Sequence, residues 1–137
     1  MRDSGALLEY AEYVDNFYGT PEEPINRAMS SGMDILLDIE PQGALQVRAK
    51  REDAILLFLA PPSLEELERR LEGRGDTAPD LIEKRLKQAK WEISQADKYD
   101  YIVINDNADV AADEVVSVIT AEKCKMKERI DLLKEEL

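Results

Sequence analysis

Residues 7–21 read LLEYAEYVDNFYGTP, and this stretch predicts a small β-ribbon. Apolar and polar residues are mixed from 8 to 13, as in a short strand with one face exposed. Asp-Asn at 15–16 supplies turn chemistry, and Phe-Tyr at 17–18 begins a second short strand that Gly19 ends. The ribbon is followed at once by a predicted helix, so the rest of the fold is built outward from it.

Three hydrogen-bonding side chains lie on this ribbon, those of Glu9, Tyr18 and Thr20. A carboxylate accepts two N–H donors side by side, and a hydroxyl donates to a carbonyl. These are the partners that guanine requires, since its N1–H and N2–H₂ are donors and its O6 is an acceptor. A structural alternative stays open: Tyr18 packs within the protein, and Thr20 only caps the following helix with Glu23 as its capping-box partner.

Composition indicates one soluble globular domain and excludes several classes of partner. The chain has 137 residues, 44% of them hydrophobic, and a formal net charge of −12. A charge of this sign repels nucleic acid and anionic membranes, so neither is expected as a partner. No apolar run approaches the roughly 20 residues of a membrane span, and the N-terminus does not resemble a signal peptide.

The absence of histidine narrows the possible chemistry. The sequence contains no histidine and one cysteine, Cys124. Catalytic triads, general bases and metal sites that use histidine are therefore excluded. A single cysteine makes no internal disulfide, which fits a reducing cytoplasm.

Apolar runs that alternate with amphipathic segments predict an α/β domain with a mostly parallel sheet. Runs of the buried-strand type are Ile35–Leu37, Ala54–Ala60 and Tyr101–Ile104. Helices are expected from Pro21 to Gly32, from Pro41 to Lys50, after Ser63 with Glu66 as its capping-box partner, from about Pro79, and from about Asp109 to the end.

Charged and polar residues gather where a ligand is expected. In open parallel sheets, ligands bind beyond the carboxyl ends of the strands. Polar residues fall there in three places: Asp38 with Glu40, Ser63, and Asn105 with Asp106. The sheet therefore contributes an acidic mouth.

The opposite charge comes from the densest basic cluster of the chain: Arg69, Arg70, Arg74, Lys84, Arg85 and Lys87. Arg74 lies between two glycines, which allow its segment to move. Mobile arginines over an acidic mouth favour a phosphate clamp, because the guanidinium fork suits phosphate oxygens. The alternative is that these arginines only pair with the glutamates of a solvated helix.

Taken together, the segments resemble guanylate kinases, which transfer a phosphoryl group from ATP to GMP. The matching pieces are LEYAEY, NFYGTP, LLDIEPQGALQVR, FLAPPSLEELERRLEGRG, the spacing from there to Arg85, and YDYIVIND. They extend from Met1 to about residue 125. No single piece is decisive, but their order and spacing are specific.

The resemblance implies a GMP-binding role for four residues. Glu9 would accept the guanine N1 and N2 protons, and Thr20 would donate to O6. Tyr18 would hold the GMP phosphate. Asp38 would lie beside the GMP site and help to orient the phosphates that carry Mg²⁺.

The resemblance also implies the residues that serve ATP and the chemical step. Arg74 and Arg85 would be the catalytic arginines, and Arg70 would hold ATP phosphates. Asn105 would lie near the adenine. Mg²⁺ would enter with ATP, held by the nucleotide phosphates and not by a protein cage. This chemistry needs positioning and electrostatics, so it does not require histidine.

The same resemblance divides the chain into functional parts. Residues 7–32 would form the GMP-binding lobe, 33–72 and 98–137 the core, and 73–97 the lid with its following helix. Two residues depart from the usual family pattern of the lobe: Asp15 replaces a glycine and Phe17 a tyrosine. Aspartate tolerates turn geometry, so an intact ribbon is expected.

One motif of the family is absent from the sequence. No G-x-x-x-x-G-K-[ST] occurs, since the six glycines, at 5, 19, 32, 43, 73 and 75, do not have that spacing. The resemblance places this P-loop, and a strand central to the sheet, before Met1. We therefore expect a truncated chain that is inactive alone and that self-associates through open sheet edges.

Three functions remain open from the sequence. The first is a guanylate kinase represented by a truncated chain. The second is a guanylate-kinase-like module that binds a partner peptide, which would have no need of Glu9, Thr20, Arg74 and Arg85 together. The third is a structural fragment that binds no nucleotide.

Overall fold

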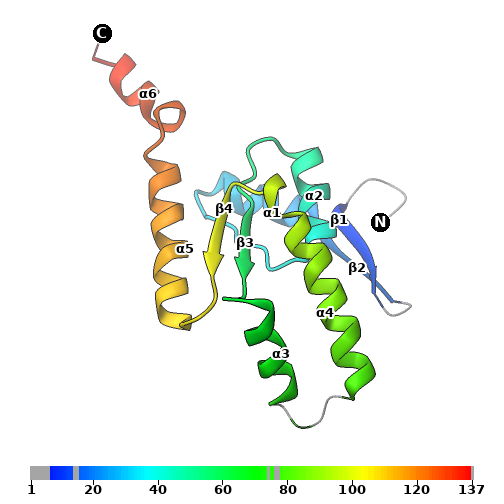
Figure 1. The fold of residues 1–137 in the computed structure, drawn as a ribbon. Coiled ribbons are helices and arrows are strands. Elements are labelled where there is room, and N and C mark those ends of the chain that lie inside the picture. Colours follow the sequence, from blue (N-terminus) through cyan, green and yellow to red (C-terminus); the bar gives the residue numbers. More distant parts are fainter. Residues whose placement is uncertain (1–6, 14–15, 74, 76–77, 137) are drawn as a thin grey trace. The chain divides into compact units, whose positions relative to one another are not determined.

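The computed structural model describes residues 7–13, 16–73, 75 and 78–136, and up to residue 20 it describes the backbone alone. The chain forms two compact units, with the division between Leu56 and Leu57. The fold is α/β, as predicted, with helices, an antiparallel ribbon and a parallel pair of strands (Figure 1).

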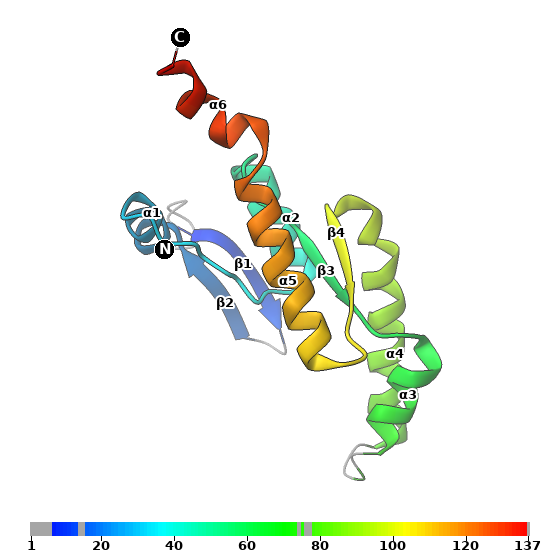
Figure 2. The same ribbon diagram turned by 90° about the vertical axis from the view of Figure 1, so that its left-hand side faces the viewer.

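The first unit begins with the predicted ribbon. Strand β1 (Leu7–Tyr13) pairs antiparallel with β2 (Asn16–Pro21), and Figure 2 shows the two strands side by side. The pairing is regular from Tyr13 opposite Asn16 to Glu9 opposite Thr20, and it then shifts by one residue so that Leu7 lies opposite Pro21. The extra residue lies on β1, which is the pattern of a β-bulge.

Helix α1 (Glu22–Ser30) follows β2 directly. The chain turns away from the helix at Gly32, the residue expected to close it. Gly32 has φ +89°, the left-handed conformation that glycine adopts readily. Its N–H donates to Met29 O (3.0 Å), and the N–H of Met33 donates to Ala28 O (3.2 Å). These two bonds form a Schellman motif, which fixes the direction in which the chain leaves α1.

Helix α2 (Pro41–Lys50) packs on β1 through an apolar face. Ala44 and Val47 are buried there. The residue after α2, Arg51, also reaches back to α1: it donates to Asn26 and makes two bonds to the Asp53 carboxylate, at 3.1 and 3.2 Å. The packing of α2 on β1 and the bonds of Arg51 are two of the links between the described elements of the first unit.

The expected strand at Ile35–Leu37 is wrong. Residues 33–40 have no regular secondary structure, and Leu36 is 77% exposed. A strand requires a neighbouring strand for its backbone N–H and C=O groups. No strand of the described residues pairs with this segment. The apolar run is therefore that of a buried strand, but the pairing that would make it one is not found in the described part of the chain.

The second unit contains the parallel pair. Strand β3 (Leu57–Ala60) pairs in parallel with β4 (Tyr101–Ile104), from Leu57 opposite Tyr101 to Ala60 opposite Ile104. The β4 prediction is correct at both ends, whereas β3 is shorter than predicted because it spans only the part that has a partner. Asn105 N–H continues the ladder with a 2.7 Å bond to Ala60 O.

Four helices and a short 3₁₀ turn complete the second unit. Helices α3 (Leu64–Glu72) and α4 (Pro79–Ser94) lie side by side, and α5 (Ala108–Lys123) packs on β4 (Figures 1 and 2). The turn η1 (Ala96–Lys98) links α4 to β4. Among the described residues, no helix is long and apolar enough to cross a membrane.

The expectation of one helix from about Asp109 to the end is also wrong. The helix breaks after α5, and α6 (Met126–Lys134) begins anew. Lys125, between the two, has an extended backbone with ψ 147°, which interrupts the hydrogen-bond ladder. Upstream of the break, the Tyr101 hydroxyl donates to the Glu122 carboxylate, and Lys125 lies 2.9 Å from it, so the end of α5 is attached to β4.

The core of the second unit gives a direct test of the packing. The Val103 side chain on β4 is 2% exposed, whereas its neighbour Ile102 is 57% exposed. We expect Val103→Ala to lower the free energy of unfolding by about 2 kcal/mol, because a cavity replaces buried methyl groups. Ile102→Ala, the matched control in the same strand, should cost less than about 0.5 kcal/mol. Urea unfolding measures both changes, and equal losses would contradict the assignment of the core.

Candidate functional site

The ribbon brings together the positions predicted to bind GMP. Glu9 lies directly opposite Thr20, and Tyr18 lies opposite Ala11. Paired positions of an antiparallel ladder share a face, and so do positions two apart in one strand. Positions 9, 18 and 20 are therefore on the same face of the ribbon. The side chains themselves lie outside the described residues.

The register of the two strands decides which residue is opposite Thr20. Leu7 lies opposite Pro21, so a regular ladder from that point would pair Leu8 with Thr20. The ladder instead runs regularly from Tyr13 opposite Asn16, and this register brings Glu9 opposite Thr20. The pair of a carboxylate residue and a hydroxyl residue is thus set by this regular register, and the irregularity lies beyond it, between Leu7 and Glu9.

The structure places the N-cap of α1 one residue after Thr20. The N-cap of α1 is Pro21, which has an extended backbone and makes no side-chain cap bond itself. Thr20 lies within β2 and is paired to β1. The helix therefore begins one residue later than expected, and Thr20 is not its capping residue.

Asp38 lies in the irregular segment before α2, and it is exposed. The sequence pattern placed it at the end of a strand, and that strand is not formed in the described residues. Its carboxylate is available to a ligand from this segment. The described residues contain no group of three or more His, Cys, Asp or Glu side chains that could hold a metal ion.

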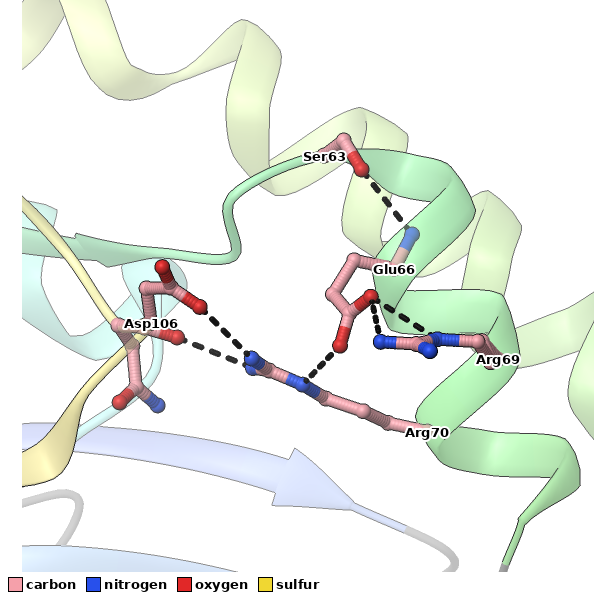
Figure 3. A network of polar contacts seen from close by, with 6 residues as sticks. Ser63, Glu66, Arg69, Arg70 and Asp106 are labelled. Carbon is pink, nitrogen blue, oxygen red and sulfur yellow. Dashed lines mark hydrogen bonds and ion pairs between the residues drawn. The ribbon is translucent and has the colours of Figure 1, made fainter.

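In the second unit, Arg70 contacts Asn105, and these are the two residues that the resemblance assigns to ATP. The Arg70 Nη1 donates to the backbone carbonyl oxygen of Asn105 at 3.0 Å, and its Nη2 lies 3.6 Å from the Asp106 carboxylate. Arg70 is on α3, and the other two residues follow β4. The guanidinium therefore connects α3 to the carboxyl end of the parallel pair (Figure 3).

The other partner of Arg70 is Glu66, one helical turn earlier. The Arg70 Nε donates to Glu66 Oε1 at 3.0 Å, and Arg69 donates through Nε and Nη2 to Oε2 of the same carboxylate. The alternative in which these arginines pair with glutamates of their own helix is thus correct in part, because Arg69 does this in the bonds just described. Arg70 does this and reaches β4 as well.

The two arginines make the Glu66 carboxyl more acidic than usual. The bond from Arg69 is the main cause that lowers the pKa of Glu66 below its ordinary value of 4.5, and the bond from Arg70 adds to it. Glu66 also takes part in the N-terminal cap of α3, since its backbone N–H donates to Ser63 Oγ at 3.0 Å. The capping residue predicted from the sequence is therefore confirmed, and the Glu66 carboxylate binds Arg69 and Arg70, as the alternative for the basic cluster expected. The spacing of three and four residues to the arginines was the available signal.

Of the two predicted catalytic arginines, Arg85 is among the described residues and Arg74 is not. Arg85 is on α4, and it is exposed. Arg74 lies outside the described residues, as do Asp76 and Thr77 of the predicted lid. Helix α3 is closed just before them by the Gly73 N–H, which donates to Arg69 O at 2.9 Å. The catalytic assignment of both arginines stays a prediction.

Most of the chain is similar in sequence to known guanylate kinases. The sequence pattern of the family described as "Guanylate kinase" matches residues 1–122. A guanylate kinase of Thermus thermophilus is 52% identical over 123 residues, which are 90% of this chain and 56% of that protein. Guanylate kinase of Halalkalibacterium halodurans is 46% identical over 131 residues, which are 96% of this chain and 64% of that protein.

A solved structure matches the fold. The crystal structure of guanylate kinase from Anaplasma phagocytophilum superimposes with a TM-score of 0.73 at 33% identity, over 90% of this chain and 60% of that one. The fold is therefore that of the nucleoside monophosphate kinases that contain a P-loop. Within that class, the chain belongs to the guanylate kinase family. It spans 56 to 64% of the length of these curated relatives.

Proposed function

We propose that the chain supplies the GMP-binding lobe, the lid and part of the core of an ATP:GMP phosphotransferase, which gives ADP and GDP. The observation that carries this proposal is the cross-strand pair of Glu9 and Thr20 in a chain of this family. That pair combines an acceptor of two N–H groups with a hydroxyl donor. Guanine, and not adenine, offers the matching edge.

In this proposal Tyr18 holds the GMP phosphate, because its position is on the face that carries Glu9 and Thr20. Arg70 and Asn105 serve ATP, and their direct contact supports a common subsite. Arg74 and Arg85 steady the charge that develops on the transferred phosphoryl group. Phosphoryl transfer requires little covalent chemistry from the protein, so positioned cations account for most of the rate.

Mg²⁺ is the cofactor that this reaction implies. The exposed carboxylate of Asp38 is of the oxygen-donor type that Mg²⁺ accepts, directly or through water. When bound with ATP, the ion neutralises charge on the phosphate oxygens. The part of Asp38 is to orient the phosphates that carry the ion. A cytoplasmic location fits these substrates and the free thiol of Cys124.

Base choice tests the proposal on the chain as it is. The chain should bind GMP with a Kd of about 1 mM, a free energy of about −4 kcal/mol, and prefer it to AMP. Glu9→Gln should weaken GMP binding about tenfold or more, because the amide presents N–H donors to the donors of guanine. Titration of GMP and AMP, followed by NMR of the backbone amides, measures both affinities.

Glu12→Gln is the matched control. It removes the same charge from the same strand, but its position is on the opposite face, since faces alternate along a strand. GMP affinity should be unchanged in this variant. Equal losses from the two variants, or an equal loss of GMP and AMP binding in Glu9→Gln, would refute the assignment of guanine to this face.

A further inference from the structure

Two consecutive arginines of α3 share one carboxylate, and they are exposed to different degrees. Glu66 binds Arg69 through Oε2 and Arg70 through Oε1 (Figure 3). The Arg69 side chain is 78% exposed, whereas that of Arg70 is 39% exposed. Only Arg70 of the two also contacts the residues that follow β4 in the bonds described above.

Helix geometry explains why one carboxylate can separate the two side chains. Successive residues of an α-helix are turned by about 100°, so Arg69 and Arg70 leave α3 in different directions. Glu66 is three residues before one and four before the other, and both spacings place side chains within reach. The carboxylate therefore lies between the two directions and binds each arginine with one oxygen.

The bond from Nε fixes the orientation of the Arg70 guanidinium. A guanidinium is planar, and its five N–H groups point in fixed directions within that plane. With Nε bound to Glu66, Nη1 and Nη2 are directed at Asn105 and Asp106. Without that bond, the long side chain would sample many rotamers at a cost to any contact that it makes.

We propose that Glu66 is a positioning residue, whose carboxylate turns the terminal nitrogens of Arg70 toward the carboxyl end of β4, where they meet phosphate oxygens of ATP. This inference rests on the proposed function for its ligand. It assigns to Glu66 a role separate from the helix cap, which uses its backbone N–H and the Ser63 hydroxyl.

Asp106 also contacts the Arg70 guanidinium, but it competes with phosphate where Glu66 favours phosphate binding. Its carboxylate lies at Nη2, on the edge that a phosphate would approach, and its side chain is 76% exposed. A phosphate must therefore displace or share this contact. Glu66, whose side chain is 23% exposed, binds Nε and so leaves the two terminal nitrogens to an incoming anion. Removal of the two carboxylates should therefore change phosphate binding with opposite signs.

The first experiment needs no ligand. Solvent exchange of the arginine Nε–H protons is followed by NMR in the 137-residue chain. Glu66→Gln should speed exchange at Arg70 by about threefold, the size of a surface ion pair. Glu65→Gln, which removes the same charge one residue away on the same helix, should leave this rate unchanged. Equal rates in wild type and Glu66→Gln, with an unchanged amide spectrum, would overturn the positioning role.

The second experiment uses tripolyphosphate as the probe, titrated against the same proteins. It should shift the Arg70 Nε–H signal and not that of Arg69. Glu66→Gln should weaken binding about threefold, and Asp106→Asn should strengthen it by about twofold, since each change is that of one exposed ion pair. Arg69→Gln should have no effect. Tighter binding in Glu66→Gln would mean that Glu66 competes with phosphate, and the proposal would be overturned.

The two experiments separate this inference from the proposed function. Faster exchange at Arg70 in Glu66→Gln, without any binding of tripolyphosphate to the wild type, would remove ATP phosphates as the ligand of Arg70. Unchanged exchange with normal tripolyphosphate binding would leave that ligand in place and refute the role of Glu66.

Discussion

The 137-residue chain, purified alone, is expected to release no ADP above background from ATP and GMP. The reason is the content of the sequence, which has no G-x-x-x-x-G-K-[ST]. In phosphoryl transfer by P-loop enzymes, the backbone N–H groups and the lysine of that motif hold the β- and γ-phosphates. Arginines over an acidic sheet end cannot replace such a cradle. A coupled assay of ADP release, at millimolar GMP and ATP, measures the rate.

A full-length guanylate kinase in the same assay is the control, and GMP binding to the chain shows that the lobe is folded. Robust turnover by the 137-residue chain would contradict the prediction. It would mean that the β- and γ-phosphates are bound by residues other than those of a P-loop, with the arginines of α3 and α4 as the first candidates.

Arg85→Ala is expected to lower kcat by about 10³-fold, in a competent enzyme that joins this chain to a P-loop segment. Arg74→Ala should lower kcat by a similar factor. An arginine that acts on charge developing in the transition state affects kcat far more than KM. We therefore expect KM for GMP to change by less than about threefold. Steady-state kinetics with GMP and ATP varied in turn separate the two parameters.

Lys84→Ala is the matched control for Arg85→Ala. Lys84 is also exposed on α4 and also cationic, but it is turned by about 100° from its neighbour. Its removal should leave kcat within about a factor of two. An equal loss in both variants would assign the effect to the net charge of α4. An effect of Arg85→Ala on KM alone would make it a residue that binds the ground state.

Local signals in the sequence predicted the parts of the fold that depend on neighbouring residues. The cap of α3 by Ser63, the end of α1 at Gly32 and the bounds of β4 all follow from patterns within a few residues. The apolar run at Ile35–Leu37 did not give a strand, because pairing is not a local property. The break at Lys125 is not marked by glycine or proline, and no local pattern announces it.

For the candidate site, too, the sequence predicted the residue types but not how they are arranged in space. The residue types at Glu9, Thr20 and Arg70 were visible in the sequence, and so was their resemblance to a family. That Glu9 is opposite Thr20 was not, since it depends on the exact register of the two strands. The contact of Arg70 with Asn105 joins residues 35 positions apart, so it required the parallel pairing of β3 and β4 to be known.

The bulge in β1 makes the ribbon respond unequally to changes in length. Because faces alternate with a period of two, the parity of the distance between Glu9 and the turn decides which face Glu9 joins. Deletion of Leu8 would remove the bulge and leave Glu9 opposite Thr20. Loss of one residue between Glu9 and Tyr13 would reverse the parity and exchange the faces. Over evolution, single-residue deletions should therefore be tolerated on one side of Glu9 and eliminated on the other.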